Sequence, residues 1–235
     1  MAELVATTPA VVLAVYAHPD DPEVACGGTL ARWAAEGAKV HLIIVCSGDK
    51  GTAEAGTDPE RLAAQRAAEV AAASAVLGLA GHTVMGVPDG EVEDTPELRR
   101  ALVAAVRTLR PDAVVCPDPT AAFFGRSYVN HRDHRVIGWA TLDAVAPAAW
   151  TPLYFPDEGP PHRVREVYLS GTLEPDVFVD IASSLTTKTE ALRCHHSQIG
   201  ASSDAVGEAM RRRAEDAGRA CGIRYAEGFR LLNPS

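Results

Sequence analysis

Short apolar runs alternate with longer amphipathic stretches along the first half of the chain. Apolar runs bounded by polar residues predict strands buried on both faces, and here they cover 11–17, 40–45, 82–87 and 113–116. Apolar positions at helical spacing predict helices over 27–37, 59–79 and 95–109. This alternation predicts an α/β fold: a Rossmann-like, mostly parallel sheet with right-handed crossovers and helices on both faces.

The second half of the chain is less regular. Its pattern predicts helices over 130–142, 183–198 and 204–220, and strands over 166–169 and 177–179. Five prolines between Pro147 and Pro161 predict an irregular segment. We expect the late strands to form a small appended, antiparallel C-terminal part, and the last residues to form no element. Because no internal repeat or low-complexity linker is evident, we expect 1–235 to be a single domain.

Charge and cysteine content narrow the choice of partner and compartment. A formal net charge of −9 argues against a nucleic acid or an anionic membrane as the partner, since both require a cationic face. Five scattered cysteines without a CxxC pair are typical of a reduced, intracellular protein. We find no signal-peptide pattern and no apolar stretch long enough to span a membrane. We therefore expect a cytoplasmic protein that acts on a small molecule; whether it forms a homo-oligomer stays open.

Reactive side chains are concentrated in four segments that follow predicted strands. Ligands of parallel α/β sheets bind beyond the carboxyl ends of the strands. The segments in that position are 18–23, 47–52, 88–90 and 118–134, and the rest of the chain is poor in such residues. The sequence therefore predicts the functional site at this edge of the sheet.

The first of these segments carries the sequence AHPDDPE. His18 and Asp21 are three residues apart, so a tight turn can direct both side chains to one point, while Asp20 and Glu23 add two further carboxylates. Clustered carboxylates repel one another and raise their own pKa values unless a cation neutralises them. A divalent metal ion would supply that charge.

The second cluster, NHRDH, lies at the predicted start of a helix. His131 and His134 are three residues apart and share a helical face, and Asp133 between them could orient an imidazole ring. Together the clusters offer two imidazoles and a carboxylate, a known catalytic zinc sphere that can also hold Fe²⁺.

Simpler interpretations exist for each motif taken alone. Helices place two histidines at this spacing by chance, and HPDD could be a turn in which an Asp caps the next helix. His195 and His196 could stabilise a helix end through the helix dipole, or could bring that end to the site. Gly27 and Gly28 fit neither the GxGxxG nor the GxxxxGK[ST] spacing, which excludes a dinucleotide or P-loop function.

Several motifs, in the same order, resemble the LmbE-like (PIG-L) family of zinc-dependent N-deacetylases. They are AHPDD with GGTLA, CSGDKGT, QRAAE, PDGEV, RPDAVVCPDP, NHRDH and ALRCHHSQ. The resemblance spans most of 11–198, and the pairing of HPDD with HxDH is its most specific part. It implies hydrolysis of the amide of an N-acylated amino sugar, or of a related glycoconjugate or secondary metabolite.

The resemblance also implies roles for individual residues. By this resemblance, the metal ligands are His18, Asp21 and His134, and the general base is Asp20. His131 would stabilise the oxyanion or protonate the departing amine. Asp133 would support His131 electrostatically. Arg66, Asp89 and His195 match positions that contact substrate, with His195 rather than His196 facing the site.

This sequence departs from the family pattern at several positions. Pro22 follows HPDD in place of an acid, Arg132 replaces a proline within HxDH, and the segment 150–166 matches no pattern, so we expect it to shape substrate choice. Other functions stay open, namely a non-sugar amidase, another metal-dependent hydrolase of antibiotic or thiol metabolism, and a non-catalytic metabolite-binding domain.

Overall fold

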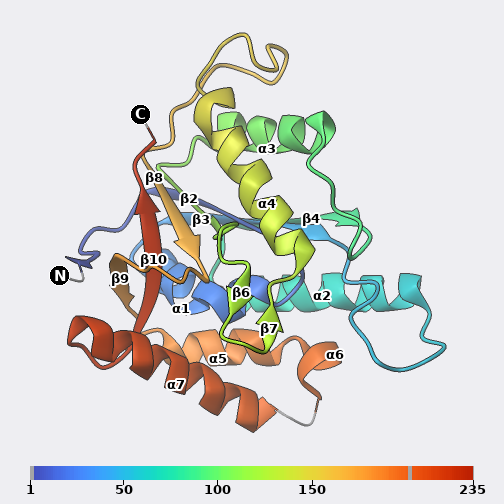
Figure 1. Cartoon of the computed structure of the whole chain (residues 1–235), viewed down its shortest axis with the longest axis vertical. Helices are drawn as coiled ribbons and strands as arrows, with labels where there is room; N and C mark the ends of the chain where they lie inside the picture. The colour runs from blue at the N-terminus through green and yellow to red at the C-terminus, as the bar shows by residue number, and fades with distance from the viewer. Residues whose placement is uncertain (1–2, 201–202, 235) are drawn as a thin grey trace.

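A central eight-stranded mixed sheet organises the chain in the computed structural model, which describes residues 3–200 and 203–234 (Figure 1). Its strands are β1 (Glu3–Leu4), β2 (Val11–Tyr16), β3 (Lys39–Cys46), β4 (Gly81–Val87), β5 (Ala113–Pro117), β8 (Glu166–Ser170), β9 (Val177–Asp180) and β10 (Ala226–Leu232). They lie in the order β1-β9-β10-β8-β5-β2-β3-β4. The five strands from β8 to β4 are mutually parallel, and β10 is antiparallel to both of its neighbours. The predicted α/β class is confirmed.

Helices cover both faces of the sheet (Figure 1). One face carries α3 (Pro96–Leu109) and α4 (Arg132–Asp143), and the other carries α1 (Asp21–Ala35), α2 (Pro59–Leu77), α5 (Leu185–Arg193) and α7 (Ser203–Cys221). Side chains of β2 alternate between the two resulting cores, because successive residues of a strand point to opposite faces. Leu13 and Val15 pack on the α3 and α4 side, whereas Ala14 and Tyr16 pack on the α1 side.

Capping residues account for several helix boundaries. The helix α2 ends at Gly78, whose φ of +73° places it in the left-handed region that favours glycine. Thr95 caps α3, where its hydroxyl accepts a hydrogen bond from the backbone nitrogen of Leu98 at 3.2 Å. Both boundaries agree with the sequence pattern to within two residues.

The first helix starts earlier than its apolar pattern indicates. We predict a start at residue 27, but α1 begins at Asp21 and is interrupted at Cys26, which has a φ of −148°. The first turn lacks an apolar stripe because it carries the polar residues of the site. A Cβ at Gly28 would lie 2.8 Å from the Ile181 side chain, so this glycine serves close packing against the end of β9.

The expected appended part is instead an extension of the main sheet. β8 continues the parallel order beside β5, and β10, which we did not predict, lies between β8 and β9. The predicted helix over 183–198 is divided into α5 and the short α6 (His196–Ile199).

Two smaller elements flank α4. The hairpin of β6 (Phe123–Phe124) and β7 (Tyr128–Val129) precedes this helix, and the π-helical turn Ala144–Ala148 follows it. No helix in the described part of the chain is long and apolar enough to cross a membrane.

A buried arginine organises the proline-rich segment. The Arg107 guanidinium, on α3, donates to carbonyl oxygens of this segment, among them those of Ala148, Thr151 and Tyr154. These bonds satisfy carbonyl groups at the end of the π-helical turn and in the irregular chain that follows it. Two cavities, of about 470 and 910 Å³, lie at the carboxyl ends of the central strands, and no residue of 150–166 lines either of them. The expectation that this segment shapes substrate choice therefore stays a prediction.

Candidate metal and catalytic site

Three potential metal ligands converge at the carboxyl ends of the central strands. His18 and Asp21 follow β2, and His134 is in the first turn of α4. His134 Nε2 lies 3.2 Å from both His18 Nδ1 and Asp21 Oδ2, and the last two atoms are 3.3 Å apart. Tetrahedral zinc with bonds of about 2.0–2.1 Å requires ligand atoms about 3.3–3.4 Å apart. The His18–Asp21–His134 cluster therefore fits such an ion.

Neighbouring groups fix the proton positions of both histidines. Nδ1 of His134 lies 2.9 Å from the side-chain oxygen of Asn130, so it carries the ring proton. Nε2 of His18 lies 3.1 Å from Asp133 Oδ2, and a carboxylate accepts but does not donate. In their neutral forms both rings thus direct lone pairs toward the Asp21 carboxylate. Three lone pairs that meet at one point require a cation.

The pKa values of the cluster reflect the same need for positive charge. Burial opposes protonation of His18, but hydrogen bonds with Asp21 and Cys46 raise its pKa to about 11. Burial also opposes ionisation of Asp21, yet His134 and His18 hold the pKa of this carboxyl well below its usual range. In the absence of a cation, a proton takes its place.

A second group of potential ligands overlaps the first. His18, Cys46 and Asp133 also bring donor atoms close together. Burial raises the pKa of the Cys46 thiol to about 11, and Asp133 Oδ2 already accepts from the backbone nitrogen of Gly90 at 2.7 Å. Asp133 and Cys46 therefore hold the His18 ring in place through its Nε2 side rather than bind a second metal ion, and the Cys46 thiol remains protonated.

Asp20 occupies an unusual backbone position beside the cluster. It precedes α1 with a φ of +95°, in the left-handed region that non-glycine residues seldom adopt. Burial and the neighbouring Asp21 raise the pKa of Asp20 to about 7, against the opposing charge of Arg66. The strained backbone directs this carboxyl into the same cavity as the metal cluster.

Arg66 connects three loops beneath this cavity. Its side chain is 3% exposed, donates to the carbonyl oxygens of Pro19 and Gly48, and lies 3.4 Å from Asp20 Oδ1. A Cβ at Gly48 would lie 2.6 Å from the Arg66 side chain, so the CSGDKGT segment wraps closely around the guanidinium. Asp89 joins the third loop to this group, because its carboxylate accepts a hydrogen bond from the Gly48 backbone nitrogen at 2.8 Å.

His131 caps α4 and remains partly exposed. Its Nδ1 accepts a hydrogen bond from the backbone nitrogen of Asp133 at 3.2 Å, which leaves the ring proton on Nε2. Burial and the nearby His18 lower the pKa of His131 and favour the neutral ring. The Asp133 carboxylate is 3.6 Å from His131 Nδ1 but 3.1 Å from His18 Nε2. The hydrogen bond of Asp133 is with His18, while its charge also acts on His131 and opposes the lowering of the His131 pKa. The expected electrostatic effect of Asp133 on His131 is therefore present, and the contact with His18 is an addition to it.

His195 is not placed to touch a substrate. It is fully buried, lines neither cavity, and has Nε2 3.3 Å from Glu23 Oε2. The Glu23 carboxylate raises the pKa of His195 against the effect of burial. The expected substrate contact is therefore absent, and Gln198, from α6, reaches the cavity instead.

The cavity over the cluster has a volume of about 470 Å³ and a polar lining. It is lined by His18, Asp20, Asp21, Lys50, Gly51, Arg66, Asp89, Gly90, Tyr128, His131, His134 and Gln198. Lys50, Tyr128 and the ring-orienting Asn130 belong to the site in addition to the residues predicted from the sequence. The spacing of Asn130 four residues before His134, one helical turn, is the signal that could have identified it.

Comparison with known proteins identifies relatives of this chain. The model for "PIG-L: GlcNAc-PI de-N-acetylase" matches residues 13–145. The diacetylchitobiose deacetylase of Thermococcus kodakarensis is 31% identical over 94% of this chain and 82% of its own length. A 1D-myo-inositol 2-acetamido-2-deoxy-alpha-D-glucopyranoside deacetylase of Saccharopolyspora erythraea is 34% identical over 66% of this chain. The match spans 62% of that relative, less than two thirds of its length.

A solved structure shows the same architecture. The N,N'-diacetylchitobiose deacetylase from Pyrococcus horikoshii superimposes with a TM-score of 0.87, at 28% identity, over 96% of this chain and 84% of its own. The fold predicted from the apolar pattern and the family resemblance are both confirmed, and these relatives are named as deacetylases. The chain belongs to the PIG-L, or LmbE-like, family of deacetylases.

Proposed function

We propose that this chain is a zinc-dependent N-deacetylase that hydrolyses the amide of an N-acylated amino sugar. His18, Asp21 and His134 would hold the metal, and the three converging lone pairs are the observation that carries the proposal. Ferrous iron is the other ion that this donor set accepts. A bound divalent ion would lower the pKa of a coordinated water and polarise the acyl carbonyl.

Asp20 is placed to act as the general base. Its carboxyl shares the smaller cavity with the three ligands, and the adjacent Arg66 holds it in position. Hydrolysis adds the water oxygen to the acyl carbon, breaks the C–N bond and delivers a proton to the departing nitrogen. A carboxyl at this point can accept the water proton and return it to the amine.

His131 is placed to donate a hydrogen bond to the reacting group. Since its Nδ1 caps α4, the proton of the neutral ring is at Nε2, on the side away from the helix backbone. A neutral imidazole donor can stabilise the negative charge that develops on the acyl oxygen. It can also assist protonation of the leaving amine.

Polar groups around the same cavity suit a sugar. Lys50, Asp89 and Gln198 offer both donors and acceptors within reach of the cluster, and Arg66 supports them from below. Relatives named for acetamido-sugar substrates favour the same class for this chain. The proposed partner is therefore a small N-acylated sugar derivative, handled by one domain spanning 1–235. Five free cysteines support a cytoplasmic location.

The test measures amine release after metal removal. The purified protein is stripped with a chelator and assayed with N-acetylglucosamine and N,N'-diacetylchitobiose, either without metal, with Zn²⁺, or with Fe²⁺ under anaerobic conditions. We expect Zn²⁺ to restore amine release and the His134→Ala variant to remain inactive. Activity of the stripped protein, or full activity of His134→Ala with bound zinc, would contradict the proposal.

A further inference from the structure

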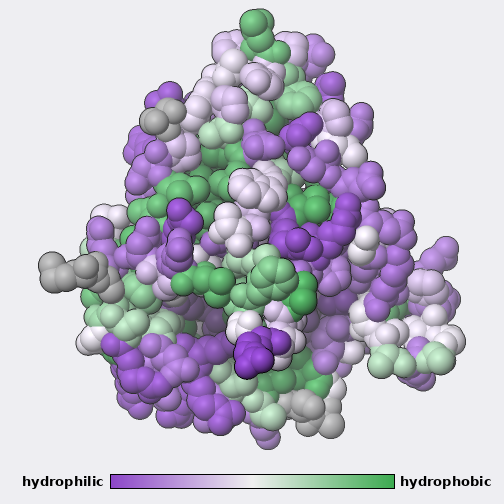
Figure 2. Space-filling view, in the orientation of Figure 1, coloured by the Kyte–Doolittle hydropathy of each residue, from purple (hydrophilic) through white to green (hydrophobic). Residues whose placement is uncertain are grey.

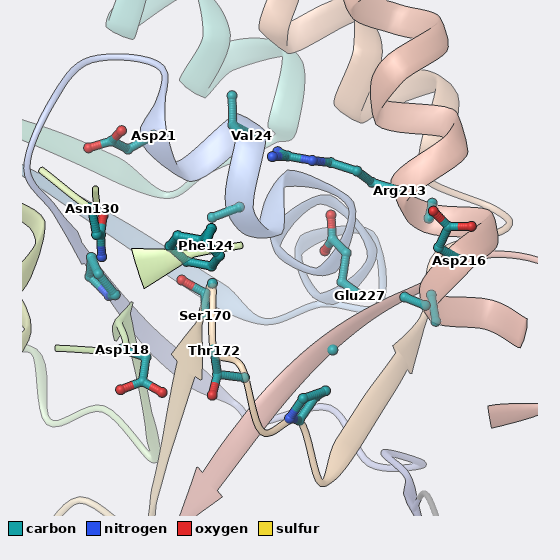
Figure 3. A pocket seen from close by; sticks show the side chains of 18 of the residues that line it. Asp21, Val24, Asp118, Phe124, Asn130, Ser170, Thr172, Arg213, Asp216 and Glu227 are labelled. Atoms are coloured by element: carbon teal, nitrogen blue, oxygen red, sulfur yellow. The ribbon is translucent and has the colours of Figure 1, made fainter. Parts of the chain in front are cut away.

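A second, larger cavity of about 910 Å³ adjoins the metal cluster from the other side. Asp21, His134 and Tyr128 line both cavities, so the cluster lies at their junction. Figure 3 shows Asp21 and Asn130 at one end of the larger cavity, and Arg213 and Asp216, from α7, at the other.

The walls of the larger cavity are mainly small or apolar side chains. They include Val24, Ala25, Phe124, Phe178, Ala214 and Ala217. Lys188 and Glu227, which also line it, are buried and paired with each other. The Asp118 carboxylate is buried and accepts from the backbone nitrogen of Thr120 at 2.8 Å. The charges in this cavity are therefore already neutralised or hydrogen-bonded, except at its exposed α7 end.

The two cavities differ in the proton-transfer groups that they contain. Asp20 and His131 line only the smaller cavity, together with the polar groups suited to a sugar. The departing nitrogen must receive a proton, so the amine part of the substrate lies on that side. The substituent on the acyl carbon then points across the cluster toward the larger cavity. An acetyl group would place only a methyl there and leave most of its 910 Å³ unfilled.

We propose that the larger cavity binds the acyl chain, and that the enzyme prefers N-acyl amino sugars with acyl groups of about six carbons over N-acetyl sugars. This inference rests on the proposed function and specifies its substrate class. In the β6–β7 hairpin, Phe124 and Tyr128 line the larger cavity, and the adjacent Phe123 and Val129 are 65% and 64% exposed, so apolar side chains gather over this hairpin (Figure 2). Each methylene buried from water gains about four-fold in binding.

The test compares N-acetyl-, N-butanoyl-, N-hexanoyl- and N-octanoylglucosamine with the zinc-loaded protein, where glucosamine is the common product. We expect kcat/KM to rise by about three- to four-fold per methylene until the cavity is filled. The Ala217→Phe variant should bring the hexanoyl-to-acetyl ratio close to one. Ala205→Phe, an exposed change on the same helix and outside the cavity, should leave the ratio unchanged.

A binding measurement tests the same inference without relying on the Ala217→Phe variant to fold. Calorimetry with Asp20→Asn, which should hold substrate without turning it over, is expected to show tighter binding of the hexanoyl than of the acetyl compound. If Ala217→Phe is unfolded by circular dichroism, the smaller change Ala217→Leu takes its place.

The outcomes separate this inference from the proposed function. Hydrolysis of acetyl but not hexanoyl substrate would overturn the acyl cavity and leave the deacetylase assignment standing. Hydrolysis of neither compound would contradict both the acyl cavity and the deacetylase assignment. A preference for N,N'-diacetylchitobiose that Ala217→Phe abolishes would show that the cavity holds a second sugar, and would also overturn the inference.

Discussion

The side-chain oxygen of Asn130 lies 2.9 Å from Nδ1 of His134, and the Asn130 side-chain nitrogen donates to the carbonyl oxygen of Ala121 at 2.8 Å. The second bond fixes which end of the amide faces the ring. His134 therefore keeps its proton on Nδ1 and its lone pair on Nε2, directed at His18 and Asp21. One neutral side chain thus sets the tautomer of a proposed metal ligand.

Replacing Asn130 by alanine should weaken metal binding. Without the acceptor the His134 ring can rotate or change tautomer, and loss of such a partner typically lowers metal affinity by about 10–100-fold. Competition with a chromophoric chelator measures this change. Asn130→Asp keeps an acceptor and should bind metal at least as tightly as the wild type. An unchanged affinity in Asn130→Ala would mean that packing alone orients the ring.

Replacing Asp20 by asparagine should separate catalysis from metal binding. Loss of a general base lowers kcat by about 10²–10⁴-fold, whereas the three proposed ligands are retained. Steady-state amine release and metal content by atomic absorption measure the two effects. Asp157→Asn, an exposed change remote from both cavities, is the matched control. Wild-type turnover in Asp20→Asn would exclude Asp20 as the base.

Adding a methyl group to Gly51 should disturb the support of Arg66. A Cβ there would meet Arg66 Nη1 well inside van der Waals distance and Gln198 Oε1 at 3.2 Å. Overpacking of this kind costs about 1–3 kcal/mol, measured as the free energy of unfolding in urea. In Gly81→Ala the nearest atom would be 3.4 Å away, so stability should change by less than about 1 kcal/mol. Equal effects of both substitutions would show that the loop yields without cost.

Zinc should stabilise the fold as well as supply chemistry. The three proposed ligands meet only in the folded chain, and a ligand that binds the folded state at 100 times its Kd adds about 2.7 kcal/mol of stability. For a chain of this size that corresponds to a rise in Tm of about 5–11 °C. Scanning calorimetry of the stripped protein with and without zinc measures the rise. His134→Ala should lose it, and an equal rise in that variant would locate the zinc elsewhere.

Local patterns were sufficient for the central α/β unit and for the approximate position of the site. The strands β2, β3 and β5 are apolar runs that show their burial directly, and Gly78 and Thr95 mark helix ends with side-chain chemistry that acts over a few residues. The rule that ligands bind at the carboxyl ends of parallel strands then brought HPDD and NHRDH together.

Other features depend on contacts between distant segments. The strand β10 has no distinctive apolar run, and its strand geometry comes from pairing with β8 and β9 on both sides. The pattern of the helix α3 likewise gives no sign that Arg107 donates hydrogen bonds to the segment after α4.

The sequence by itself determined the family, the α/β class and the residue types of the site, because local periodicity and motif spacing are written along the chain. Only the tertiary structure decided that Asp133 bonds to His18 rather than His131, that His195 is buried against Glu23, and that a larger cavity adjoins the cluster. These relationships depend on the direction of each side chain in space. That direction is set by packing between elements far apart in sequence, which the pattern along the chain does not record.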